Sequence, residues 1–256
     1  MMRNWTMAAL PLALALTVTA CSGTVTTDGD KGGGDARTHS ADAGPPTTQN
    51  FALTGFTGVE VTGPDDVTIR QGDAFSITAK GPKAEVEELE IKLDGQTLSI
   101  GRKREGFSFN HGDHDGVQIA ITMPKLGAVR LTGSGSVDAD SVDGDAVEAA
   151  LTGSGDLKIA KLTGKSAELT VSGSGDLQVA GGAIASGEMG ITGSGDIDAG
   201  GLAAQTLDIS VTGSGNVGAQ ATGKADIRIL GSGDVDLTGG GTCSTKTMGS
   251  GTATCK

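Results

Sequence analysis

The tripeptide Gly-Ser-Gly stands at Gly133-Ser134-Gly135 and occurs seven times in the second half of the chain. Successive copies are 20, 20, 20, 20, 18 and 18 residues apart. A period this regular is typical of a repeat architecture in which each repeat is one structural unit. The later copies begin at Gly153, Gly173, Gly193, Gly213, Gly231 and Gly249.

Aliphatic and polar residues alternate on both sides of each triplet. In the first six copies apolar residues stand two positions before the first glycine and four and six positions after it, as Leu151, Leu157 and Ile159 do around Gly153; the seventh copy has Thr247 at the first of these positions. Alternation with a period of two predicts β-strands that turn one face to a core. Because no helical pattern separates the strands, we predict an all-β fold, a parallel β-solenoid. Its seven coils would stack ~4.8 Å apart into a rod of about 34 Å.

The two glycines of each triplet fall on inward positions of this alternation. A corner or a pinched wall needs residues without a side chain, and glycine adopts backbone angles that other residues avoid. A phosphate-binding loop is the alternative interpretation. It is not favoured, because no Lys-Ser/Thr pair follows any triplet and no helix is expected after one.

Residues 1–20 have the features of a secretory signal peptide. Arg3 supplies the positive start, and the apolar run that follows, about a dozen residues long, is too short to span a bilayer. The run ends in Val18-Thr19-Ala20-Cys21, which resembles the bacterial lipobox. That resemblance predicts lipidation of Cys21 and a membrane-anchored protein of the cell envelope, at the outer membrane if the cell is a diderm. Cleavage at an ordinary signal-peptide site nearby is the alternative.

Residues 21–48 are rich in Gly, Thr, Asp, Ser and Pro and offer almost nothing to bury. This composition predicts a disordered tether, followed by one folded domain over residues 49–256. After removal of residues 1–20 the chain carries 18 Lys and Arg against 31 Asp and Glu, because Arg3 is lost. The resulting formal charge of −13 argues against nucleic acid as a partner.

Residues 51–130 lack the triplet but keep the strand pattern, for example at residues 67–69 and 89–93. Asp94-Gly95 predicts a hairpin turn. Residues 85–90 are compatible with a helical turn, but the alternation after Val86 favours a strand. All five Phe lie in residues 51–109, so we expect bulkier side chains to cap this end.

The order of these motifs resembles the "putative auto-transporter adhesin, head GIN domain" family of bacterial envelope proteins over residues 51–256. The resemblance implies a right-handed β-solenoid that is exported to the envelope, and it transfers no catalytic residues. It rests on Phe56 with residues 59–61, Val67-Thr68-Ile69-Arg70-Gln71-Gly72, Leu98-Ser99-Ile100, residues 117–124 and the repeated Gly-Ser-Gly-Asp.

Cys243 and Cys255 depart from the pattern of that family. They lie six residues before and six residues after Gly249, so both are predicted to point inward in the last coil. An exported chain permits disulfides, and the last coil has an exposed end that needs closing. We predict a Cys243–Cys255 disulfide that stabilises the fold by about 3 kcal/mol in the chain-entropy model. Two buried free thiols are the alternative; zinc is not favoured, because no His lies near either cysteine.

Two acidic segments are weak candidates for a cation site. One contains His111, Asp113, His114 and Asp115, donors that suit a divalent metal. A polar loop between strands is the favoured alternative for that segment.

The second is an outward row of four Asp and one Asn on strands ~4.8 Å apart, where a cation would relieve the repulsion between the carboxylates. Solvated side chains are favoured there, because the Gly-Gly-x-Gly-x-Asp pattern of calcium-binding β-rolls is absent. We therefore expect neither a metal nor another cofactor. The row comprises Asp156, Asp176, Asp196, Asn216 and Asp234.

Three functions are compatible with these features. The favoured one is a non-enzymatic lipoprotein that presents the solenoid as an adhesion or interaction module for a glycan or for another envelope or surface protein. The second is a structural or signalling accessory of the envelope. A polysaccharide-active enzyme is less favoured, because the repeats offer only scattered bases beside their acids. The predicted polar wall for binding is Thr152, Ser154, Asp156, Ser172, Ser174, Asp176, Thr192, Ser194, Asp196, Thr212 and Ser214.

Overall fold

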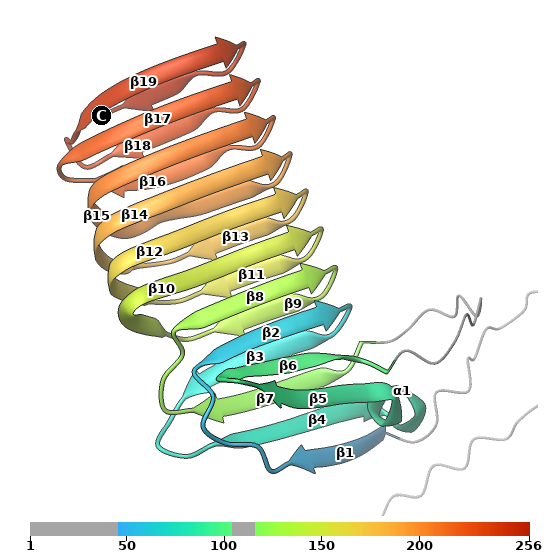
Figure 1. Ribbon diagram of the computed structural model, residues 1–256. Coiled ribbons are helices and arrows are strands. Elements are labelled where there is room, and N and C mark those ends of the chain that lie inside the picture. The colour runs from blue at the N-terminus through green and yellow to red at the C-terminus, as the bar shows by residue number, and fades with distance from the viewer. Residues whose placement is uncertain (1–45, 104–115) are drawn as a thin grey trace, which may run out of the picture. The chain divides into compact units, whose positions relative to one another are not determined.

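Each coil of the repeat region contains a long strand, a Gly-Ser-Gly turn and a short strand, as shown by the computed structural model in Figure 1. The structure describes residues 46–103 and 116–256. Residues 1–20, Cys21, nearly all of the predicted tether and the four candidate ligands in residues 111–115 lie outside the described residues. The strands of the repeat region are β8 (Ala128–Gly133), β9 (Ser136–Ala139), β10 (Val142–Gly153), β11 (Asp156–Ile159), β12 (Leu162–Gly173), β13 (Asp176–Val179), β14 (Gly182–Gly193), β15 (Asp196–Gly213), β16 (Val217–Ala221), β17 (Lys224–Gly231), β18 (Val235–Thr238), β19 (Thr242–Gly249) and β20 (Ala253–Cys255).

Equivalent strands of successive coils pair in parallel and in register. Leu151 lies opposite Leu131 on one side and Val171 on the other, and Leu157 lies between its equivalents in the same way. The long strands therefore form one layer and the short strands a second layer behind it (Figure 1). This arrangement confirms the predicted parallel β-solenoid.

The N-terminal section contributes two further levels to the stack, and their order along the chain differs from their order in space. β2 pairs in parallel with β8 on one side and with β6 on the other. β3 in turn pairs in parallel with β9 and with β7. The coil formed by β2 and β3 is thus enclosed between strands that come later in the sequence. The elements of this section are β1 (Pro46–Phe51), β2 (Gly58–Gly63), β3 (Asp66–Gln71), β4 (Ser76–Pro82), α1 (Lys83–Glu88), β5 (Leu89–Asp94), β6 (Thr97–Arg102) and β7 (Gln118–Met123).

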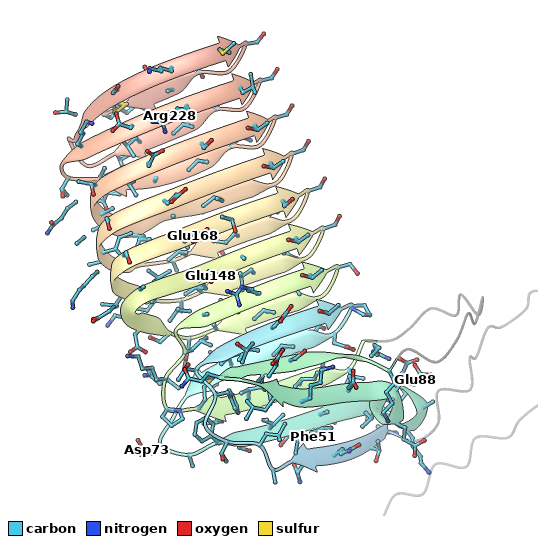
Figure 2. The ribbon with its side chains drawn as sticks, viewed as in Figure 1. Phe51, Asp73, Glu88, Glu148, Glu168 and Arg228 are labelled. Carbon is cyan, nitrogen blue, oxygen red and sulfur yellow. A yellow bond between two sulfur atoms is a disulfide. The ribbon has the colours of Figure 1, made fainter. Side chains whose placement is uncertain are left out.

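Antiparallel strands close the N-terminal end of the stack. β4 pairs with β7, β1 pairs with β4, and β5 pairs with β6 through the predicted hairpin at Asp94-Gly95. Phe56 is fully buried, and its ring lies 4.8 Å from that of Phe75, measured between centroids. Phe51 packs against the same core from β1 (Figure 2). The bulky cap is therefore confirmed, and its first strand begins at Pro46, inside the segment assigned to the tether.

The prediction of a strand immediately after Val86 was wrong at its start, because residues 83–88 form the helix α1. Lys, Ala and Glu, which make up most of this segment, favour helix. Val86 is its one buried residue, and the next buried side chain, Leu89, already belongs to β5. Two apolar residues three positions apart suit a helical turn as well as an irregular strand.

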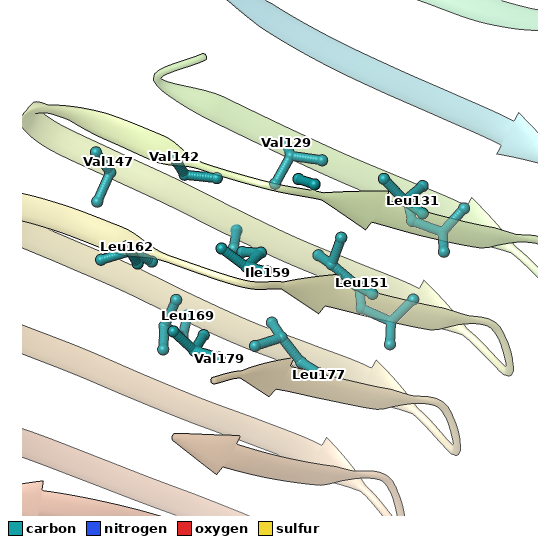
Figure 3. Close-up of a cluster of buried hydrophobic side chains, with 14 of the residues drawn as sticks. Val129, Leu131, Val142, Val147, Leu151, Ile159, Leu162, Leu169, Leu177 and Val179 are labelled. Carbon is teal, nitrogen blue, oxygen red and sulfur yellow. The ribbon is translucent and has the colours of Figure 1, made fainter. Parts of the chain in front are cut away.

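The inward rows predicted from the alternation are buried. Leu151, Leu157, Ile159 and their equivalents in the neighbouring coils are at most 3% exposed. Figure 3 shows Leu151 and Ile159 among the other aliphatic side chains of this core. The last coil is the exception, because Thr247 and Cys255 are exposed at equivalent positions.

The glycines of the triplet allow the backbones of successive turns to touch. Gly193 has a φ of 129°, which L-residues rarely adopt. A Cβ added there would lie 2.2 Å from the carbonyl oxygen of Gly173, and a Cβ on Gly195 would meet the Gly175 oxygen at the same distance. The corner interpretation of the triplet is confirmed, with close stacking as its physical reason.

Ile197→Ala tests the assignment of inward and outward rows. Ile197 is 1% exposed and lies in register between Leu177 and Val217. We expect the cavity to lower the free energy of unfolding by about 2–4 kcal/mol. Thr192→Ala, on the exposed row, should change it by well under 1 kcal/mol. Denaturant unfolding of both variants at an unchanged slope is the measurement, and a larger loss for Thr192→Ala would reverse the assignment.

Candidate functional site

A groove of about 640 Å³ runs across the long strands β10, β12, β14, β15 and β17. The first four strands contribute the same three consecutive positions and β17 contributes two of them, so the groove follows the stacking direction. The first coil contributes Ala146, Val147 and Glu148, and the next contributes Ser166, Ala167 and Glu168. Because the strands are in register, a residue type repeated every 20 positions becomes a continuous row along the groove.

One row consists of carboxylates. Its members are register partners from β10 to β17, so neighbouring carboxylates belong to strands ~4.8 Å apart. Glu148 and Glu168 are seen on adjacent long strands in Figure 2. The row, called the acidic row below, comprises Glu148, Glu168, Glu188, Asp208 and Asp226.

Cations pair with the two ends of the acidic row. Arg130 forms an ion pair with Glu148, and hydrogen bonding to this carboxylate raises the pKa of Arg130. At the other end Arg228 lies 2.7 Å from Asp208. Lys224 lies 2.7 Å from Asp226 and lowers the pKa of that carboxyl by hydrogen bonding to it.

The centre of the acidic row has no such compensation. Within the part of the chain that the structure describes, neither Glu168 nor Glu188 forms an ion pair, and both side chains are exposed. Exposed carboxylates this close repel one another and concentrate negative potential in the groove. A cation or a hydrogen-bond donor is therefore attracted most strongly to the middle of the groove.

A row of hydroxyl groups lies beside the acidic row. Ser186 donates a hydrogen bond to the Lys165 carbonyl at 3.4 Å, and Thr206 donates one to the Ala185 carbonyl at 3.3 Å. Since each proton points along the stack to the preceding coil, each hydroxyl oxygen keeps lone pairs for an incoming donor. The groove thus presents two parallel rows of acceptors.

The predicted polar wall is exposed except at Asp196, which is half-buried, but its rows do not lie together on one face. The Thr row ends the long strands, the Ser row occupies the turns and the Asp row begins the short strands, as Thr152, Ser154 and Asp156 illustrate. The predicted residues therefore wrap around the edge of each coil. None of them lines the groove on the long strands.

The Asp row does line a second, smaller hollow of about 410 Å³ on the short strands. Asp156, Asp176 and Asp196 contribute to it, together with Asp198 and Lys158. Toward the C-terminal end, carboxylates of this row accept hydrogen bonds from other residues of the protein.

Two carboxylates of the row accept hydrogen bonds from the next coil. The Asn216 backbone N–H donates to Asp196 at 2.7 Å. Asp234 accepts hydrogen bonds from the hydroxyl and backbone N–H of Thr252 at 2.6 and 2.8 Å, and these lower the pKa of its carboxyl. The repulsion expected along the row is therefore relieved in part by the protein's own donors.

No metal centre is formed by the residues for which the structure gives a position: they contain no group of three or more His, Cys, Asp or Glu arranged to hold an ion. Over the same residues, no helix has the length and apolar character needed to cross a bilayer.

A buried ion pair at the N-terminal end escaped the sequence analysis. Asp65 is the one charged residue buried among the described residues, and Arg102 donates to both of its carboxylate oxygens, at 2.6 and 3.2 Å. The Val117 backbone N–H donates to the same carboxylate at 3.0 Å. Burial disfavours the charge on Arg102, but its hydrogen bonds to Asp65 and Glu85 outweigh this and raise its pKa.

The even-offset pattern contains the signal that would have located Asp65. Val61 stands two positions before Gly63, and Val67 and Ile69 stand four and six positions after it, as apolar residues do around the first six triplets. Gly63 lies in register with Gly133, so Gly63-Pro64-Asp65 is a turn in which Asp replaces the second glycine. Lys103 precedes and Gly116 follows residues 104–115, which the structure does not describe.

Comparisons with known proteins agree with this architecture. A family model described as "putative auto-transporter adhesin, head GIN domain" matches residues 55–241. A search of curated proteins returned no match.

Several solved structures share the fold. A putative adhesin from Bacteroides fragilis is 21% identical with a TM-score of 0.70, and the match covers 83% of this chain and 97% of that one. A putative adhesin from Parabacteroides merdae is 20% identical with a TM-score of 0.66 over the same shares. A putative lipid binding protein from Parabacteroides distasonis is 21% identical with a TM-score of 0.64, also over 83% and 97%.

Proposed function

Because this chain belongs to the putative auto-transporter adhesin, head GIN domain family, we propose that it is a non-enzymatic lipoprotein of the cell envelope whose solenoid binds a partner at the cell surface. The observation that carries the proposal is the groove on the long strands, where five carboxylates and a row of hydroxyls stand in register. Repetition at a fixed spacing suits a partner that is itself extended and repetitive.

The composition of the groove defines the chemistry of that partner. Its lining contains no aromatic side chain, so a sugar ring has no surface on which to stack. Its exposed polar groups are mainly acceptors, and its centre is negative. A partner that donates many hydrogen bonds fits this surface: a hydroxyl-rich glycan, or a protein segment with repeated Lys or Arg.

The acidic row, rather than a hydrolytic site, is the feature we assign to binding. A polysaccharide lyase places a basic side chain that accepts a proton beside its acid cluster. Lys224 is the basic side chain in the lining of the groove, and it is engaged by Asp226. Arg130 and Arg228, outside the lining, are engaged by Glu148 and Asp208. The central Glu168 and Glu188 can therefore attract a partner.

A binding screen of residues 46–256 against envelope and host glycans and surface proteins tests the proposal. We expect a ligand whose affinity falls about tenfold or more in Glu168→Gln/Glu188→Gln, because the central charge is lost. Asp156→Asn/Asp176→Asn is the matched control, since it removes two carboxylates from the hollow on the short strands. Its affinity should stay within about twofold of the parent.

The salt dependence of binding distinguishes the two partner classes. Affinity for a cationic protein should fall steeply with salt, whereas affinity for a neutral glycan should not. Equal losses in the two double variants would remove the groove as the site. A complete absence of ligands would favour the second function, a structural or signalling accessory of the envelope.

Cys21→Ser tests the proposed anchor. The apolar run and the lipobox-like tetrapeptide that precede Cys21 predict that its thiol carries the lipid. We expect the variant to incorporate no labelled fatty acid and to be released from membranes, because serine lacks the thiol to which the diacylglyceryl group is attached. Metabolic labelling and membrane fractionation are the measurements, and equal label in variant and parent would contradict the prediction.

A further inference from the structure

The last coil covers the core without contributing a core of its own. In β19, Thr245 and Thr247 lie opposite Ile227 and Ile229 of β17. The two isoleucines are 1% and 2% exposed, whereas both threonines are exposed. Among residues 242–256 no side chain is buried. Only Cys243 and Ala253 of this coil pack against the core, and both are only partly buried. This coil therefore has far fewer of the apolar contacts that hold the others in the stack.

Strand pairing holds this coil from one side only. β19 pairs with β17, and the three-residue β20 pairs with β18. In the described part of the chain no strand pairs with the outer edge of either. The opposite end of the stack is closed by antiparallel strands. An edge strand without a core is expected to open at low free energy.

A disulfide between Cys243 and Cys255 supplies the missing connection. It joins β19 to β20, and therefore the long-strand layer to the short-strand layer, within the last coil. The bridged residues are 12 positions apart. Cys255 is exposed and Cys243 is partly buried, so an incoming thiolate can reach the bridge.

We propose that this disulfide holds the last coil on the stack under redox control, and that its reduction by a dithiol releases residues 242–256. Release uncovers the aliphatic row beneath and the pairing edges of β17 and β18. The covered row comprises Ala225, Ile227, Ile229, Val235 and Leu237. This proposal is independent of the groove and of the binding function assigned to it.

The reduction is a two-electron thiol–disulfide exchange with a dithiol reductant. A thiolate of the reductant attacks Sγ of Cys255, which forms a mixed disulfide and releases Cys243 as a thiolate. The second thiolate of the reductant then attacks the reductant's first sulfur, which is bonded to Cys255 in the mixed disulfide. Cys255 leaves as a thiolate. Both cysteine thiolates take up the protons that the dithiol has lost, and the reductant becomes a disulfide.

Hydrogen exchange of the mature, lipidated chain in detergent, with and without dithiothreitol, tests the proposal. We expect reduction to lower amide protection in residues 242–256 on the order of 100-fold, the equilibrium effect of opening a loop of this length. Protection in β11 to β14 should stay unchanged. Cys243→Ser/Cys255→Ser should show the low protection without reductant and no further change with it.

Three results would overturn the proposal. The first is unchanged protection in residues 242–256 after alkylation and mass measurement have established full reduction. The second is a loss of protection throughout the domain, which would make the disulfide a staple of the whole fold. The third is a disulfide that dithiothreitol does not reduce without denaturant, because redox control requires that dithiols reduce it in the folded protein.

Discussion

Arg102→Met is expected to lower the free energy of unfolding by about 3–5 kcal/mol, because it leaves the carboxylate of Asp65 buried without its counter-ion. Asp65 is fully buried, and Arg102 is its only cationic partner among the described residues. The Val117 backbone N–H remains as a hydrogen-bond donor, but one neutral donor does not replace a bidentate guanidinium. Denaturant unfolding at neutral pH is the measurement.

A double variant separates the ion pair from the packing around it. Asp65→Gly/Arg102→Met removes both charges. It also makes position 65 a glycine, as its register partner in the next coil, Gly135, already is. We expect the double variant to be more stable than Arg102→Met alone, since no charge then stays buried. A loss of less than about 1 kcal/mol in Arg102→Met would show that water or another group satisfies Asp65.

Gly193→Ala is expected to lower the free energy of unfolding by about 3 kcal/mol or more, although it adds one methyl group. Two costs combine at this position. An L-residue is strained at a φ of 129°, and the new Cβ would lie 2.2 Å from the Gly173 carbonyl oxygen. That oxygen belongs to the backbone of the preceding coil and already accepts a hydrogen bond from the Ser194 N–H at 2.8 Å. It cannot withdraw without breaking the stack.

Two controls divide this loss into its parts. Gly55 also has a positive φ, 85°, but a Cβ there would meet no atom within 4 Å. Gly55→Ala therefore measures the strain alone, about 1–2 kcal/mol. Ser194→Ala, at the exposed tip of the same turn, should change stability by no more than about 0.5 kcal/mol. Equal losses in Gly193→Ala and Gly55→Ala would show that contact between coils is not the cause.

The sequence was sufficient for the parts of the fold that repeat. A period of two identifies the inward face of each strand, so Leu151, Leu157 and Ile159 could be assigned to the core. The Gly-Ser-Gly period located each turn, because backbone contact between coils excludes a side chain there. The cysteine pair was found by the same counting, since Cys243 and Cys255 are placed symmetrically about Gly249.

The N-terminal section was harder because its neighbours in space are not its neighbours in sequence. β2 and β3 are enclosed by strands that follow them by tens of residues, and one turn replaces glycine with Asp65. A carboxylate becomes acceptable at that corner only because Arg102, 37 positions later, reaches it. Local residue patterns contain no information on such a pairing.

The site shows the same division. Alternation separates the outward from the inward residues, so Glu168 and Thr192 could both be placed on the surface from the pattern alone. Which outward residues lie in a hollow depends on how the long strand bends and on how successive coils stack. The stacking places Glu148, Glu168 and Glu188 side by side in a groove and distributes the Thr, Ser and Asp of the turn around an edge. The alternation in the sequence predicts which face of a strand a residue lies on. The curvature of that face arises only when the coils pack.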